Sequence, residues 1–162
     1  MKKPGRVARK ASIRRKVITL AVASCFATEL AHANPTGASV VSGQVSITTN
    51  GNLVQVTNSP GSIINWQGFS IGANEITRFL QQSASSTVLN RVVGVNPSVI
   101  LGTLQSNGRV LLINSNGIVF GSGATIDTAG LVASSLKMSD ADFQAGRMKF
   151  TDGAGAGNVT ND

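Results

Sequence analysis

The sequence predicts an all-β protein and favours a solenoid of short strands. Val, Ile and Thr, which prefer strands, make up 34 of the 129 residues from 34 to 162. In the second half of the chain, strand-like segments recur every 7 to 10 residues, and Asn recurs beside the turns, at positions 90, 96, 114 and 116. This spacing suits the sides of a coil better than long hairpins. A sandwich or a barrel, also built from short strands with regular turns, remains an alternative.

The first predicted strands flank an Asn-Gly turn. Residues 41–48 alternate as V-S-G-Q-V-S-I-T, and residues 52–57 continue as N-L-V-Q-V-T. Such alternation is typical of half-buried strands, and Asn50-Gly51 is a strong turn signal between them. Residues 62–71 are more apolar and predict two strands bent near Gly68.

The later strands are predicted from apolar runs that Gly, Asn and Pro separate. The runs cover residues 87–95, 99–104, 109–113, 118–120, 125–127 and 131–134. One short helix is predicted at residues 139–145, because Ser139 occupies an N-cap position and Asp142 follows three residues later, as in a capping box. Gly146 would end this helix. A loop that crosses one face of the coil is the alternative.

The last residues lose the apolar periodicity. After Phe150 the sequence continues as T-D-G-A-G-A-G-N-V-T-N-D, without a recognisable cap. A solenoid needs its terminal turn covered. We therefore expect a chain truncated at its C-terminus relative to a longer protein, with a frayed final turn.

The positive charge of the chain is concentrated in a leader. Eight of the 14 Lys and Arg residues lie within the first 16 residues, whereas residues 34–162 carry six basic and six acidic residues. The basic run, the apolar run 17–27 and the small-x-small sequence Ala31-His32-Ala33 together predict a cleavable signal peptide over residues 1–33, cut before Asn34. The apolar run is shorter than the roughly 20 residues of a membrane span, so a retained anchor is less favoured.

The route and the composition limit what the mature chain can do. Arg14-Arg15 suggests export by the twin-arginine route, but the residues around this pair match the twin-arginine motif poorly. Export through the Sec translocon is therefore preferred. Cys25 and His32, the chain's single Cys and single His, both fall in the leader, which leaves residues 34–162 without disulfides, Cys/His metal sites or a histidine base. The acidic residues are scattered. Because the charges of residues 34–162 balance, no basic surface that would attract nucleic acid is expected. We expect no enzyme activity, no cofactor, no metal and no nucleic-acid partner.

The stretch that is most characteristic of a protein family is residues 90–121, N-R-V-V-G-V-N-P-S-V-I-L-G-T-L-Q-S-N-G-R-V-L-L-I-N-S-N-G-I-V-F-G. Together with residues 64–72, 123–136 and 139–143, it resembles the N-terminal secretion (TPS) domain of the filamentous haemagglutinin family, the exported partner of two-partner secretion systems. The resemblance covers most of residues 34–162. It implies a right-handed parallel β-helix with short extra-helical β elements.

The resemblance also implies a task. The domain would be recognised in the periplasm by the POTRA modules of a TpsB-type outer-membrane barrel, which passes the chain to the surface of a Gram-negative cell, where the domain nucleates β-helix folding. The downstream protein would be adhesin-like, and its receptor or glycan is not indicated. A polysaccharide-active β-helix enzyme and a stand-alone adhesive module are the alternatives.

Two Asn-Pro signatures mark secretion in that family. The first falls on Asn96-Pro97-Ser98-Val99, and the second on Asn114-Ser115-Asn116-Gly117-Ile118. Ser115 stands where the family usually has Pro, which restores a backbone N–H and releases the φ restraint. The signatures either contact the transporter or serve only as β-helix corners needed for folding, and the residues alone leave both interpretations open.

Overall fold

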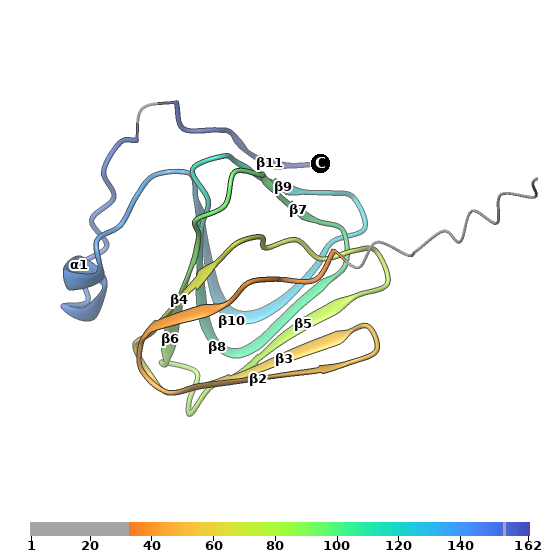
Figure 1. Ribbon diagram of the computed structural model, residues 1–162, viewed down its shortest axis with the longest axis horizontal. Coiled ribbons are helices and arrows are strands. Elements are labelled where there is room, and N and C mark those ends of the chain that lie inside the picture. The colour runs from red at the N-terminus through yellow and green to blue at the C-terminus, as the bar shows by residue number, and fades with distance from the viewer. Residues whose placement is uncertain (1–32, 154) are drawn as a thin grey trace, which may run out of the picture.

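The computed structural model describes residues 33–153 and 155–162, which coil into a three-sided parallel β-solenoid (Figure 1). Each turn of the coil, here called a rung, stacks on the preceding one through parallel strand pairing. This confirms the predicted parallel β-helix and excludes the sandwich and the barrel. In the part of the chain that is described, no helix is long and apolar enough to cross a bilayer.

Each side of the solenoid is a stack of parallel strands. The first side consists of β3 (Leu53–Asn58), β5 (Ile76–Leu80) and the N-terminal parts of β8 (Thr103–Ile113) and β10 (Thr125–Ser134). The second side consists of β4 (Ser62–Trp66), β6 (Thr87–Val92) and the C-terminal parts of β8 and β10. The third side consists of β7 (Ser98–Ile100), β9 (Ile118–Phe120) and β11 (Val159–Asn161).

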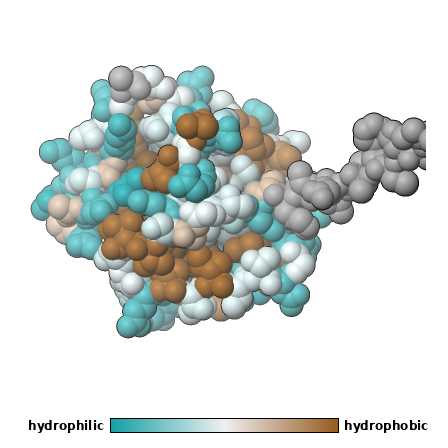
Figure 2. Space-filling view, viewed as in Figure 1, coloured by the Kyte–Doolittle hydropathy of each residue, from teal (hydrophilic) through white to brown (hydrophobic). Residues whose placement is uncertain are grey.

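Two antiparallel strands close the N-terminal end of the coil, as the resemblance implied for extra-helical elements. β1 (Ser39–Ser42) pairs with β4, and β2 (Val45–Asn50) pairs with β3. The turn between β2 and β3 contains Gly51 at φ +57°, which confirms the Asn-Gly turn. Exposed Val40, Val41 and Ile47 lie on β1 and β2, and hydrophobic residues gather over these strands in Figure 2.

The last rung is interrupted by a long excursion, residues 135–158, called here the crossing segment. It contains α1 (Asp140–Gln144) and an antiparallel bridge between Lys137 and Thr151. The Oγ of Ser139 accepts a hydrogen bond from the N–H of Asp142 at 3.1 Å, so the predicted N-cap is confirmed. The predicted helix forms within a segment that also crosses the outer face of the second side.

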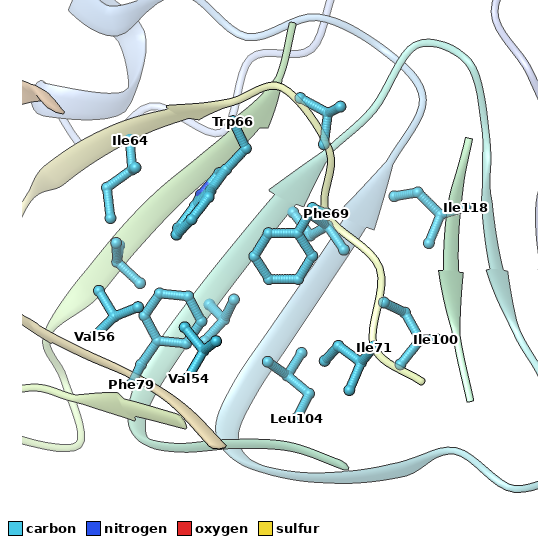
Figure 3. Packing of buried hydrophobic residues seen from close by; sticks show 14 of the residues in the cluster. Val54, Val56, Ile64, Trp66, Phe69, Ile71, Phe79, Ile100, Leu104 and Ile118 are labelled. Atoms are coloured by element: carbon cyan, nitrogen blue, oxygen red, sulfur yellow. The ribbon is translucent and has the colours of Figure 1, made fainter. Parts of the chain in front are cut away.

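Two hydrophobic clusters stabilise this arrangement. Inside the coil, Phe69 packs edge-on against Trp66, with ring centroids 5.6 Å apart, and stacks on Phe79 at 6.4 Å (Figure 3). Outside it, the crossing segment covers the second side with Met138 and Phe143, which pack against outward-facing Ile63, Leu89, Leu111 and Ile113. The second side is therefore buried on both faces.

Several strand boundaries differ from the sequence-based expectation. β5 lies where no strand was predicted, and β11 forms where the apolar periodicity is lost. β8 runs without a break through Asn107-Gly108, because the Asn107 side chain pairs with the backbone of Gln81 on the neighbouring rung, at 2.7 Å in both directions. The amide of Asn107 thus replaces ladder hydrogen bonds at the corner, which lets the chain bend while it stays paired.

Candidate functional site

The two signatures meet on the third side of the solenoid, one rung apart. β7 and β9 pair in parallel, which places Ser98 opposite Ile118 and Val99 opposite Val119. The N–H of Ser98 donates to the carbonyl of Gly117 at 3.0 Å. Two segments that were identified separately in the sequence therefore form a single corner, called here the signature corner.

A fully buried amide holds the signature corner together. The Nδ2 of Asn114 donates to the carbonyl of Asn96 and to the Oγ of Ser98, each at 3.0 Å. Its Oδ1 accepts from the N–H of Asn116 at 3.0 Å and from the Asn116 Nδ2 at 3.1 Å. Because a buried amide without partners is costly, the two bonds to Asn96 and Ser98 fix one rung on the next, and the two from Asn116 fix the local turn.

Asn116-Gly117 of the second signature forms a turn, and a later part of the chain completes it. Gly117 adopts φ +109°, a conformation that side chains disfavour. The N–H of Ile118 donates to the carbonyl of Asn158 at 3.0 Å, and the carbonyl of Ser115 accepts from the N–H of Gly157 at 2.8 Å. Ser115 therefore takes part in the corner through its backbone carbonyl.

Burial divides the signature residues into two groups. Ser98, Asn114, Gly117 and Ile118 are buried, and Ser115 is half-buried. Asn96, Pro97, Val99 and Asn116 are exposed. In the folded domain the first group can act only through the fold, whereas the second is accessible to a partner.

Exposed apolar side chains lie in and beside the exposed group, and among them only Val99 belongs to a signature. Val95 is 84% exposed, and Val93, Val99 and Leu101 are also exposed. We call these four residues the apolar ridge. The sequence analysis placed all four within predicted strands, at residues 87–95 and 99–104, whereas in the structure Val93 and Val95 lie in the connection between β6 and β7, Val99 lies in β7 and Leu101 follows it.

A groove beside the signature corner carries positive charge. Its cavity of about 380 Å³ is lined in part by Val93, Asn116, Lys137 and Arg91. Lys137 is exposed, whereas Arg91 is held by the carboxylate of Asp140 at 2.6 Å and by the carbonyl of Met138 at 3.0 Å. The Arg91 contacts tie the crossing segment to the second side next to the groove.

The expected cleavage site lies at the edge of the described chain. Ala31, together with Cys25, His32 and the rest of residues 1–32, falls outside the described residues. The N–H of Ala33 donates to a carboxylate oxygen of Glu75 at 3.1 Å. Asn34 is 8% exposed, and its Nδ2 donates to the carbonyl of Asn52 at 3.4 Å. The Ala33–Asn34 bond is therefore packed against the first rung in the folded chain.

The acidic residues of the described chain form no metal-ligating cluster. Among residues 33–153 and 155–162, no group of three or more His, Cys, Asp or Glu could hold a metal ion. A hydrogen bond from Ser139, followed by the interaction with Arg147, lowers the pKa of Asp142 below its ordinary value of 3.8. These contacts belong to the helix cap and to an ion pair of 2.8 Å between Asp142 and Arg147.

Comparisons with known proteins agree with the fold. The TPS secretion domain family matches residues 31–162, and the chain belongs to this family. It is a family of secretion domains rather than of enzymes. The sequence-based resemblance to a TPS domain is thereby confirmed.

Individual relatives come from Haemophilus influenzae. A heme/hemopexin-binding protein of strain Rd is 43% identical over 100 residues, covering 61% of this chain and 11% of that protein. Another heme/hemopexin-binding protein is 36% identical over 88 residues, covering 54% of this chain and 10% of that protein. The crystal structure of the HMW1 secretion domain matches with a TM-score of 0.76 and 38% identity, covering 79% of this chain and 35% of that chain. The chain thus spans about a tenth of the curated relatives.

Proposed function

We propose that the chain is the N-terminal secretion domain of a large, exported, adhesin-like protein. The POTRA modules of a cognate outer-membrane barrel would recognise it in the periplasm, and the barrel would release it at the surface of a Gram-negative cell. The observation that carries this proposal is the family match over residues 31–162. The meeting of both signatures at one corner supports it.

Within the signature corner, the two groups of residues have different roles in this proposal. Buried Asn114 and Ser98 keep β7 and β9 in register, and their effect on export is indirect. Exposed Asn96, Pro97, Val99 and Asn116 offer the transporter both polar and apolar contacts. The apolar ridge enlarges this surface, since exposed apolar side chains grouped together often mark an interaction site.

Residues 1–33 form a cleavable Sec signal peptide in this proposal. The family match begins at residue 31, next to the expected cut before Asn34. In the folded domain Asn34 is buried and Ala33 is hydrogen-bonded to Glu75. The signal peptidase must therefore cut the Ala33–Asn34 bond before the first rung has formed. Cleavage therefore precedes folding, as it does for a chain that emerges unfolded from the Sec translocon.

Outside the cell, the domain nucleates folding of the chain that follows. Each rung buries its apolar residues against its neighbours, so a completed rung is a template for the next one. The antiparallel pairs β1–β4 and β2–β3 close the N-terminal end and give propagation one direction, from the N-terminus onwards.

Heme or hemopexin binding, which the names of two relatives state for those proteins, is not assigned to this domain. The chain covers about a tenth of each relative. The described residues include neither His nor Cys, the side chains that most often ligate heme iron. We place any such binding in regions beyond the secretion domain.

The test is to express the whole chain in a Gram-negative host with and without its cognate barrel. We expect release into the medium only with the barrel, and N-terminal sequencing should find a product that starts at Asn34. A barrel from an unrelated two-partner system is the matched control and should release none. Periplasmic retention with both barrels would overturn the proposed export role, and release without any barrel would do the same.

A further inference from the structure

A second concave site lies between α1 and the outer face of the second side, away from the signature corner. Its cavity has a volume of about 660 Å³. The sheet wall includes Thr87, Arg109, Leu111 and Val132, and the opposite wall includes Phe143, Gln144, Gly146 and Met148. Figure 1 shows α1 standing beside this side of the solenoid. We call this cavity the α1 groove.

Strand register places a cation at one end of the α1 groove and apolar side chains further along. Arg109 lies between Thr87 and Gly130 on the adjacent strands, and Leu111 pairs with Val132 two residues further on. Leu111 and Phe143 already pack together in the outer cluster, so the apolar surface that the groove still offers is that of Val132, which is half-buried, and Met148, which is 55% exposed. A ligand chain that covers these two side chains gains the free energy of apolar burial.

Arg109 is available to a ligand. Its side chain is exposed and makes no ion pair or hydrogen bond with the residues that the structure describes, whereas Arg91 and Arg147 are each paired with an Asp. It is the one charged residue among those lining the α1 groove. Gly130 makes room for its stem, because a Cβ at position 130 would lie 3.3 Å from the Cγ of Arg109.

We propose that the α1 groove binds a single-chain amphiphile with an anionic headgroup. The guanidinium of Arg109 pairs with the headgroup, and the alkyl chain lies against Val132 and Met148. A guanidinium donates two parallel hydrogen bonds to a carboxylate, which fixes the orientation of the ligand. A cationic headgroup would be repelled at the same position. This site is independent of the export role, since it uses no signature residue.

The first test is calorimetric titration of the full secreted chain with dodecanoate below its micelle concentration. Dodecyltrimethylammonium has the same chain with the opposite charge, and butanoate has the headgroup without the chain. We expect one dodecanoate per protein molecule and at least tenfold weaker binding of the other two compounds, as a charge-assisted contact and a buried chain each require. Equal affinity for both headgroups, or no binding of dodecanoate, overturns the proposal.

Charge reversal locates the site. R109E should weaken dodecanoate binding at least tenfold and favour dodecyltrimethylammonium, whereas R78E is the matched control, because Arg78 lies on the first side, bonded to Gln105. Backbone amide spectra of each variant verify folding. Should R109E misfold, G130L tests the same site with the arginine retained, because the new side chain occupies the space of the Arg109 stem.

Three further outcomes count against the proposal. An equal loss of dodecanoate binding in R109E and R78E would show only non-specific charge attraction. Amide shifts confined to residues outside the α1 groove would place the ligand elsewhere. A dimer in sedimentation velocity that R109E dissociates would assign the groove to a second copy of the chain.

Discussion

Replacing Asn114 by Ala separates the folding role of the signature corner from its recognition role. The substitution removes four hydrogen bonds at a fully buried position and leaves the buried Ser98 hydroxyl, the Asn96 carbonyl and the Asn116 N–H without this partner. At about 1 kcal/mol for each group left behind, N114A should lower the free energy of unfolding by about 3 kcal/mol. That is a large share of the stability of a small domain.

The matched control is N116A. Asn116 is exposed, and its Nδ2 bonds to the Gly94 carbonyl at 2.9 Å and to Asn114. Water can replace these contacts, so the expected loss is below about 1 kcal/mol. Urea unfolding followed by tryptophan fluorescence measures both variants, since Trp66 lies in the inner cluster. A loss below about 1 kcal/mol for N114A would refute the argument that this amide joins the rungs.

Export assays on N116A and on V95S then address recognition. If the exposed residues contact the transporter, N116A and V95S should reduce barrel-dependent release while the folded domain keeps nearly its full stability. Val95 is 84% exposed, so its replacement removes little packing. Normal release of both variants would leave the signatures with a folding role alone.

Three other predictions concern the crossing segment and the second side. F143A should cost about 3 kcal/mol in urea unfolding, because Phe143 fills the outer cluster, and a loss near zero would mean that the crossing segment is not docked. G94A should prevent native folding as judged by circular dichroism, because a Cβ at this position would lie 1.9 Å from the Gln67 carbonyl oxygen; a native spectrum would contradict this close approach. The pKa of Asp142 is lower in the folded chain than its ordinary 3.8, so its carboxylate stabilises the fold above that pH, and this contribution is lost as the pH falls through the folded value. D142N should flatten the dependence of unfolding on pH below about 5, and an unchanged profile would argue against the Ser139 and Arg147 contacts.

The sequence predicted the solenoid and most of its strands because alternation and turn residues are local signals. Ser139 and Asp142 predicted the helix cap for the same reason. β5 was missed, because I-T-R-F-L offers only weak alternation and its neighbours are two turn-rich stretches. β11 was missed for a different reason: its residues are exposed, and the strand exists through pairing with β9. Such a strand depends on a partner that no local pattern reveals.

The candidate site was predictable in position but not in structure. Resemblance located both signatures, yet only the parallel pairing of β7 with β9 brings them together. The central role of Asn114 follows from its burial, which a turn-rich sequence gives no means to foresee. Likewise, the α1 groove exists because the crossing segment returns over the second side, and this long-range packing joins residues from 60 to 148.

The hydrogen bonds of the signature corner imply an order of events during export. The N–H of Ile118 and the carbonyl of Ser115 find their partners in Asn158 and Gly157, about 40 residues later in the chain. The corner is therefore complete only after the crossing segment has returned and β11 has paired with β9. In the proposed export route the chain reaches the periplasm unfolded, and at that stage the backbone groups of the second signature would be free to bind another protein. Folding then occupies these groups internally, so a transporter that binds them would release the domain as the last rung closes.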